Sequence, residues 1–254
     1  MQSTIRLLVM TLVISFFISS IAHSQLVWQD DFESYPLGSF PSPPWYASGN
    51  TGGAYIDDSV SFSGSQSLYL FGIIGGCWGV DAYRAITIPP PFTIEFMVYN
   101  GSENIYGCHP FRGSLELKSG TNWWDCGRYL MDFRNDGRIM LYDSIGWHYN
   151  EQEWVKVKVN YSRPTPTHVH LKYWVNDQLL YEVDSPNISC EDNLAYVGIA
   201  AQEGTAWFDD VKVIGGGPAI PTLTEWGLII FGVVLVGFIT YVYLRRRKAV
   251  VSLR

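Results

Sequence analysis

The stretch Trp154-Val155-Lys156-Val157-Lys158-Val159 alternates apolar and charged side chains. Successive side chains of a β-strand point to opposite faces, so we expect the valines to face a core and the two lysines to face water. Val169 to Val175 repeats the alternation, and Asn176-Asp177 is a turn signal that leads into a further strand, Gln178 to Val183. These segments predict an antiparallel sheet with one solvated face.

Similar short segments lie on both sides of this stretch, separated by clusters of glycine, proline, asparagine and aspartate. The further strands that we expect are Leu26–Phe32, Ser67–Phe71, Tyr83–Ile88, Phe92–Tyr99, Ser114–Lys118, Tyr129–Phe133, Leu194–Ala201 and Trp207–Ile214. Ser39 to Asn50 is predicted to be a loop around Trp45, and Asp136-Gly137 supplies the positive φ angles of a tight hairpin. About twelve short strands with regular turns predict an all-β fold, a two-sheet antiparallel sandwich.

The N-terminal residues depart from this pattern. Arg6 is followed by the apolar run Leu7 to Ala22, and Ala22-His23-Ser24 places small residues at the two positions that a signal peptidase reads. Residues 1–24 are therefore predicted to be a signal peptide, cleaved before Gln25, and the alternative is an uncleaved membrane helix.

The C-terminal residues predict a membrane anchor. The uncharged segment 226–244 is followed by Arg245-Arg246-Arg247-Lys248. At ~1.5 Å per residue it would span about 28 Å, close to the thickness of the hydrocarbon core. The basic cluster should stay in the cytoplasm, so the domain between the two ends is predicted to lie outside the inner membrane. Residues 215–219 are expected to form a flexible linker before the anchor.

Net charge excludes one class of partner. Of the 17 basic residues, six lie in the two terminal segments, whereas Glu225 is the one acidic residue of 24 that does. The remaining 11 basic and 23 acidic residues give the exported part a net charge of −12. A field of this sign repels phosphate backbones, so we expect no nucleic acid partner.

The four cysteines predict disulfides. Cys77, Cys108, Cys126 and Cys190 are an even set in an exported chain without a CxxC motif. Four cysteines allow three pairings, and the sequence does not choose among them. Counting loops alternately along the strands would put Cys126 at one end of the sandwich and the other three at the opposite end.

Three segments carry a resemblance to a known fold family. Asp30-Asp31-Phe32-Glu33, the stretch Ser63 to Leu68 and the closing stretch Trp207 to Val213 resemble the concanavalin A-like, or laminin-G-like, jelly rolls of secreted bacterial proteins. The resemblance covers residues 25–214. It implies a jelly roll whose first and last strands lie together.

The C-terminal tail carries a second resemblance. Ile220-Pro221-Thr222-Leu223-Thr224-Glu225-Trp226-Gly227, an apolar segment and the run Arg245-Arg246-Arg247 resemble the IPTL-CTERM sorting signals, which often have serine where this chain has Thr224. The resemblance covers residues 220–254. It implies that an exosortase-like membrane protease recognises and removes the tail, and that the domain passes to the cell surface or extracellular matrix.

Acidic residues near the two ends of the domain could bind calcium. If the terminal strands pair, Asp31 and Glu33 approach Asp209 and Asp210, and a structural Ca²⁺ would relieve the repulsion between these carboxylates. The alternative is that one carboxylate of each pair is solvated while the other accepts a hydrogen bond from a turn.

Aromatic residues in predicted loops could form a glycan site. Aromatic faces stack on sugar C–H surfaces while polar neighbours hydrogen-bond the hydroxyl groups. The candidate ligand-binding residues are Trp78, Tyr106, His109, Arg112, Trp123 and Trp124. The alternative is that these aromatic side chains pack in the core or between loops.

Motifs for catalysis are missing. The Glu-x-Asp-x-x-Glu strand of laminarinase-like enzymes, the Gly-x-Ser-x-Gly turn and the His-Glu-x-x-His helix do not occur, and Glu116 stands alone on its predicted strand. We therefore assign no catalytic residue. The function that we favour is a surface-sorted, lectin-like binding or adhesion protein that contacts extracellular polysaccharide. The alternatives are a structural envelope protein without a ligand site and a polysaccharide-active lyase or hydrolase.

Overall fold

A computed structural model describes residues 25–49, 53–72, 79–102, 111–122, 124–142, 144–186 and 190–216. The predicted signal peptide, most of the predicted linker and the whole predicted sorting signal lie outside these residues. Within the described residues, no helix has both the length and the apolar character needed to cross a membrane.

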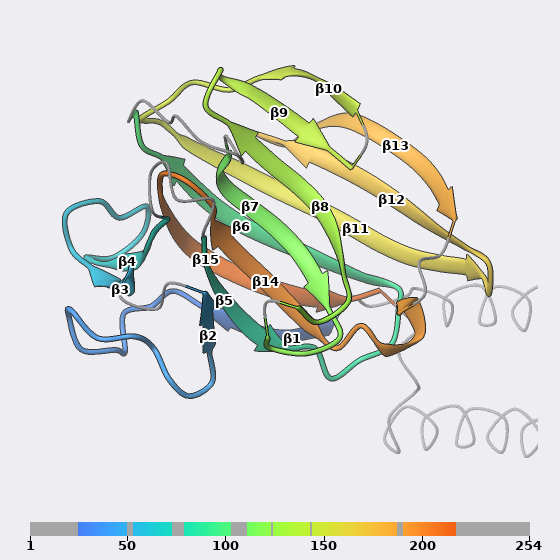
Figure 1. The fold of residues 1–254 in the computed structure, drawn as a ribbon, viewed down its shortest axis with the longest axis horizontal. Coiled ribbons are helices and arrows are strands. Elements are labelled where there is room, and N and C mark those ends of the chain that lie inside the picture. Colours follow the sequence, from blue (N-terminus) through green and yellow to red (C-terminus); the bar gives the residue numbers. More distant parts are fainter. Residues whose placement is uncertain are drawn as a thin grey trace, which may run out of the picture. The chain divides into compact units, whose positions relative to one another are not determined.

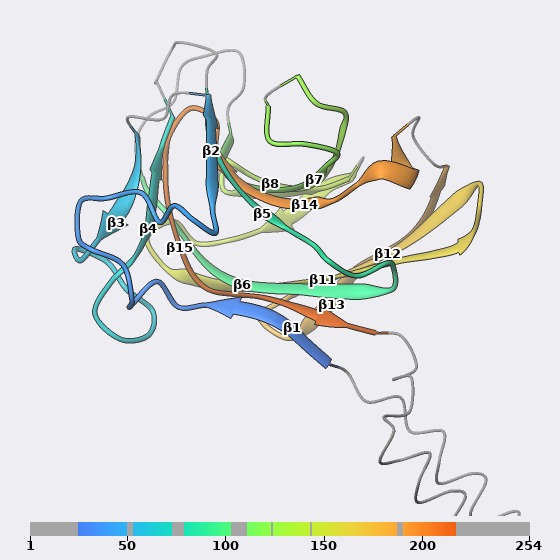
Figure 2. The same cartoon turned by 90° about the horizontal axis from the view of Figure 1, so that it is seen from below.

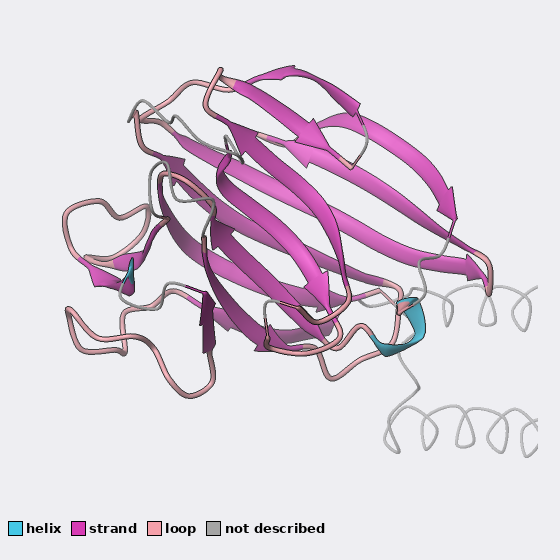
Figure 3. Ribbon diagram, viewed as in Figure 1, coloured by secondary structure: helices cyan, strands magenta, loops and turns pink. Residues whose placement is uncertain are grey.

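The regular secondary structure of the described chain is almost entirely β-strand (Figures 1 and 3). In chain order they are β1 (Gln25–Asp30), β2 (Tyr46–Gly49), β3 (Ala54–Asp57), β4 (Ser67–Phe71), β5 (Val80–Ala85), β6 (Phe92–Asn100), β7 (Phe111–Lys118), β8 (Gly127–Arg134), β9 (Arg138–Leu141), β10 (Ser144–His148), β11 (Trp154–Thr165), β12 (His168–Val175), β13 (Gln178–Pro186), β14 (Tyr196–Ala201) and β15 (Thr205–Gly215). A short 3₁₀ helix, Glu191–Asn193, precedes β14.

The strands form two antiparallel sheets that lie on each other as the layers of a jelly-roll-like sandwich (Figure 2). One sheet has eight strands in the order β13-β12-β11-β6-β15-β4-β3, with β1 paired to β15. The other has seven strands in the order β10-β9-β8-β7-β14-β5-β2. The predicted all-β sandwich is therefore confirmed.

The alternation in β11 works as predicted. Val155, Val157 and Val159 are buried in the core between the sheets, whereas Lys156 and Lys158 point outward. Phe96 and Phe208, on the neighbouring strands of the same sheet, pack in this core with ring centroids 5.8 Å apart. Because the unit Ser24–Gly217 is compact and encloses its own core, we expect it to fold without the two terminal segments.

The first and last strands of the domain pair, as the resemblance implied. Gln25 lies opposite Gly215 and Asp30 opposite Val211 along the β1–β15 ladder. The sequence placed Gly215 in the linker, but it is the last residue of β15.

Several sequence predictions differ from the structure. The predicted loop 39–50 contains β2, and Trp45 is fully buried with its indole N–H donating to Asp30 Oδ2 at 2.8 Å. The strand expected at 83–88 is β5, which begins three residues earlier and ends at Ala85. β2 and β3 have only four residues each, and β2 consists of Tyr-Ala-Ser-Gly, so we attribute their strand structure to pairing with β5 and β4.

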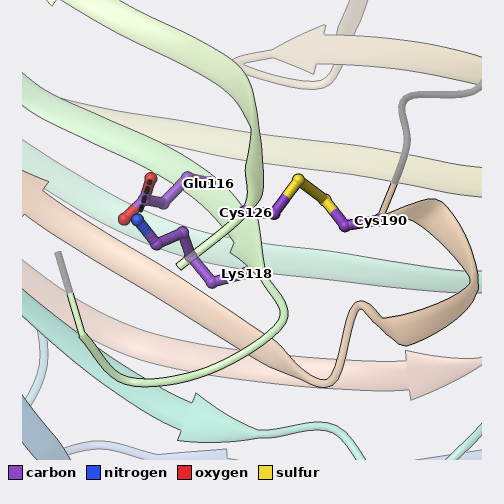
Figure 4. The surroundings of a disulfide bond; sticks show 4 residues. All are labelled: Glu116, Lys118, Cys126 and Cys190. Atoms are coloured by element: carbon purple, nitrogen blue, oxygen red, sulfur yellow. Dashed lines mark ion pairs between the residues drawn. A yellow bond between two sulfur atoms is a disulfide. The ribbon is translucent and has the colours of Figure 1, made fainter. Parts of the chain in front are cut away.

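One disulfide joins Cys126 and Cys190 (Figure 4). The loop count placed these two cysteines at opposite ends of the sandwich, and that assignment is wrong. The segment between β13 and β14 carries Cys190 to the end of the domain where the β7–β8 loop reaches Cys126. Cys77 and Cys108 lie outside the described residues.

Candidate functional site

The outer face of the seven-stranded sheet carries buried charge. On β7, Leu115 and Leu117 point into the core, so the alternating residues Ser114, Glu116 and Lys118 point outward. All three are nevertheless buried. Charged side chains are rarely buried unless they are paired, so this face needs an explanation other than solvation.

One row of side chains crosses this face along the strand register. Tyr46 of β2 lies opposite Tyr83 of β5, Tyr83 opposite Gly198 of β14, Gly198 opposite Glu116 of β7, and Glu116 opposite Tyr129 of β8. A Cβ atom at position 198 would lie 2.6 Å from the Tyr83 ring and 2.8 Å from Glu116 Cγ. The glycine therefore leaves room for the Tyr83 hydroxyl to reach across β14 and donate to Glu116 Oε1 at 2.8 Å.

A second row lies on the same face, two residues further along β5, β14 and β7. Asp81 of β5 lies opposite Ala200 of β14, Ala200 opposite Ser114 of β7, and Ser114 opposite Asp132 of β8. Asp81 and Asp132 are 1% and 3% exposed. The atoms of these two rows that are buried without a hydrogen-bond partner are both Asp81 carboxylate oxygens, Glu116 Oε2, Asp132 Oδ1 and Ser114 Oγ.

We call Asp81, Tyr83, Glu116, Lys118, Tyr129 and Asp132 the acid–tyrosine cluster. Its one ammonium group, Lys118 Nζ, lies 4.0 Å from Glu116 Oε2 (Figure 4). The same nitrogen lies 5.9 Å from the centre of the Tyr83 ring. Tyr129 is 46% exposed and Tyr46 is 48% exposed, so a tyrosine ring is accessible near each end of the first row. Tyr196 of β14 packs edge-on against Tyr46, with ring centroids 6.3 Å apart.

Burial changes the acidity of the cluster. Loss of solvation, together with the neighbouring Glu116 carboxylate, raises the pKa of Asp81 to about 8. The same two causes raise the pKa of Asp132 to about 7. Burial also raises the pKa of Glu116, against the opposing effect of Lys118. At neutral pH the cluster therefore holds protons that exposed carboxylates would have lost.

Sequence reasoning had singled out a different set of residues. Trp78, Tyr106, His109 and Trp123 lie outside the described residues. Arg112 is buried at the start of β7, where its guanidinium donates to the Tyr149 hydroxyl and to the Glu151 carboxylate. Trp124 lies in the β7–β8 loop beyond the other end of β7 and is 82% exposed. Arg112 and Trp124 are thus near opposite ends of β7, and the structure does not bring these two predicted site residues together.

The predicted calcium residues hold a loop. Glu33 accepts from the backbone N–H groups of Ser65 and Gln66, both at 2.8 Å, and these bonds lower its pKa. Asp209 accepts from two further backbone N–H groups of the same loop, at Phe62 and Ser63, Asp210 accepts from the Ser63 hydroxyl, and Asp31 accepts from the Glu33 N–H. In the part of the chain that the structure describes, no three His, Cys, Asp or Glu side chains are grouped so that they could hold a metal ion. Calcium at these residues stays a prediction.

Comparisons with known proteins give the fold alone. No family model and no curated protein matches the chain. A solved structure from work on the endo-acting O-glycanases with which human gut bacteria initiate mucin breakdown has 10% sequence identity and a TM-score of 0.51, over 75% of this chain and 99% of that chain. An endo-β-1,4-glucuronan lyase of Trichoderma reesei has 8% identity and a TM-score of 0.46, over 75% and 96% of the two chains. The carbohydrate recognition domain of Emp47p has 11% identity and a TM-score of 0.47, over 76% and 98%.

Proposed function

We propose that this protein binds extracellular glycan, and that the sugar chain lies across the acid–tyrosine cluster on the outer face of the seven-stranded sheet. The observation that carries the proposal is the row from Tyr46 to Tyr129, which combines two accessible aromatic rings with a buried carboxylate between them. Sugar rings stack on aromatic faces, and sugar hydroxyl groups donate to carboxylate oxygens.

The dimensions of the row suit an oligosaccharide. It crosses five adjacent strands, and at ~4.8 Å between strands its length is about 19 Å. Buried carboxylate oxygens without a well-formed hydrogen bond, such as those of Asp81, are costly at about 1–3 kcal/mol each. A ligand that supplies hydroxyl or amino donors would remove this cost, which favours a binding site over a purely structural role. The O-glycanase structure supports the proposal to the extent that a sandwich of this kind acts on glycan in that protein.

We also propose that the protein reaches its ligand by export. A signal peptidase would remove residues 1–24, and an exosortase-like protease would later remove the tail that begins at Ile220. The domain would then act at the cell surface or in the extracellular matrix as a binding or adhesion module.

A glycan array with the fragment 25–216 tests the binding proposal, with Tyr129→Ala as the site variant. Phe62→Ala is the matched control, because Phe62 is a similarly exposed ring that packs on Trp154 of the other sheet. We expect the fragment to bind at least one glycan class, Tyr129→Ala to weaken that binding about tenfold, and the control to leave it unchanged. No binding to any glycan by a folded fragment would overturn the proposal in favour of a structural envelope protein. Release of new reducing or unsaturated ends would identify the protein as an enzyme instead.

A further inference from the structure

The acid–tyrosine cluster has more carboxylates than cations. Three carboxyl groups, those of Asp81, Glu116 and Asp132, lie on the same sheet face, and Lys118 is the one ammonium among them. Arg134 acts on Asp132 from the end of β8, but its guanidinium pairs with Asp136 at 3.3 Å. Neither oxygen of Asp81 makes a hydrogen bond of ordinary geometry, and the one donor that acts on its carboxyl group is the Tyr83 hydroxyl, which also donates to Glu116. The cluster therefore has acceptor capacity left over for a ligand, and its carboxyl groups can become negatively charged when a bound cation displaces their protons.

The excess of carboxyl groups over ammonium groups should make the affinity of the cluster depend on the charge of the glycan. A uronic acid polymer would bring further carboxylates next to a cluster that already has three carboxyl groups and one ammonium group, and these carboxylates would repel any cluster group that ionises in such a weakly solvated site. An ammonium group brings three donors and a positive charge, and it is attracted to the faces of tyrosine rings. Lys118, between Glu116 and the Tyr83 ring, is an example of such an arrangement within the protein itself.

A metal ion is a poorer match for the same charge. Asp81, Glu116 and Asp132 do not form a group that could hold a metal ion in the described part of the chain. Carboxylates spread over several strands suit an extended organic ligand, which can place one ammonium and several hydroxyl groups along the face.

We infer that the glycan bound at the acid–tyrosine cluster contains amino sugars with free ammonium groups. The inference rests on the proposed function and names the class of glycan. Binding of an ammonium group favours the ionised form of a neighbouring carboxyl group, so a bound amino sugar would expel a proton from Asp81 or Asp132. The groups that face these carboxyls from the surrounding strands are Tyr46 and Ser48 of β2, Tyr83 of β5, Tyr196 of β14, Ser114, Glu116 and Lys118 of β7, Tyr129 and Arg134 of β8, and Met140 of β9.

Calorimetry with the fragment 25–216 tests the inference with three probes, which are oligomers of glucosamine, of N-acetylglucosamine and of mannuronate. At pH 6 the glucosamine amine is protonated, while Asp81 and Asp132 still hold protons. We expect the glucosamine oligomer to bind at least tenfold more tightly than the other two. Titrations in buffers with different ionisation enthalpies should show release of about one proton per bound ammonium group, since each newly ionised carboxyl group loses one.

Two variants distinguish binding at the cluster from a general attraction of cations to an acidic protein. Asp81→Asn keeps the shape of the side chain and should reduce both the preference and the proton release. The double variant Glu182→Gln and Asp184→Asn removes two exposed charges from the other sheet and should change neither. Equal affinity for the acetylated and free amines, or an unchanged preference in Asp81→Asn, would overturn the inference and leave glycan binding standing. Failure to bind any glycan on the array would overturn the proposed function itself.

Discussion

The Tyr83 hydroxyl donates to Glu116 Oε1 at 2.8 Å across an intervening strand, directly above Gly198. Tyr83 belongs to β5 and Glu116 to β7, and β14 lies between them. Any residue other than glycine at position 198 would place a Cβ atom within 3 Å of both side chains. Gly198 is therefore a precondition for joining the two halves of the acid–tyrosine cluster.

The first prediction concerns this glycine. Gly198→Ala should separate Tyr83 from Glu116 and destabilise the domain by about 1–3 kcal/mol, the usual cost of overpacking a filled site. Gly146→Ala is the control, because a Cβ atom there meets nothing within 4 Å. Urea unfolding of the two variants checks the difference. Equal stability would mean that the cluster does not depend on this close approach.

The second prediction is a stability that falls as pH rises. Asp81 and Asp132 have folded-state pKa values of about 8 and about 7, above the usual aspartate value of 3.8. Between pH 4 and pH 8 the folded state therefore holds more protons than the unfolded state, so its stability decreases with pH across this window. Thermal melting at a series of pH values should show a loss of several degrees, since 1 kcal/mol corresponds to about 2–4 °C in a domain of this size.

The double variant Asp81→Asn and Asp132→Asn should flatten that dependence. Burial also raises the pKa of Asp209, to about 6, so a smaller slope with the same sign should remain. A melting temperature of the unchanged protein that rises between pH 5 and pH 8 would contradict the assignment of raised pKa values.

The sequence could predict features that depend on neighbouring residues, whereas features that depend on pairing between distant strands could not be predicted from it. The strand β11 was predicted because its alternation lies within six consecutive residues, whereas β2 was missed because its four residues carry no such pattern. Glu116 looked isolated because its partners lie at positions 81, 83, 129 and 132. The strand order β5-β14-β7-β8 brings them together, and that order follows from long-range pairing. Short spacing along the sequence instead favoured Arg112, His109 and the nearby aromatic residues as a site.

The third prediction concerns the disulfide. The bond closes a segment with a sequence separation of 64 residues, so its loss should destabilise the domain by about 4 kcal/mol if chain entropy in the unfolded state dominates. The double variant Cys126→Ser and Cys190→Ser, compared by urea unfolding with the unchanged fragment, measures this. A change below 1 kcal/mol would show that entropy lost on closing this segment does not govern stability.

The fourth prediction concerns processing of the tail. If residues 220–254 are a sorting signal, the protein recovered from its own host should lack the segment 226–244, as measured by intact mass. Neutral residues in place of Arg245, Arg246 and Arg247 should disturb orientation or processing, because the basic cluster fixes the cytoplasmic end. A mature protein that retains the apolar segment would argue against removal by a protease, and the prediction of a membrane anchor would stand.

The fifth prediction distinguishes a surface aromatic residue from a core one. Trp124 is 82% exposed, so Trp124→Ala should change the stability of the domain by less than about 0.5 kcal/mol. Trp45 is fully buried and donates to Asp30, so Trp45→Ala should cost about 3–5 kcal/mol. Figure 2 shows the β7–β8 loop, which carries Trp124, on the outer side of the seven-stranded sheet, the side to which Glu116 and Tyr129 point.

Binding to the glycan found on the array then decides the role of Trp124. We expect Trp124→Ala to weaken binding by at least threefold, because an exposed indole beside the proposed glycan path would stack on a sugar ring. Phe62→Ala removes an exposed ring that packs against Trp154 of the other sheet, and it controls for general loss of apolar surface. Unchanged affinity together with unchanged stability would remove Trp124 from the site and confine recognition to the tyrosine row. A large loss of stability would instead mean that the indole packs against the domain in solution.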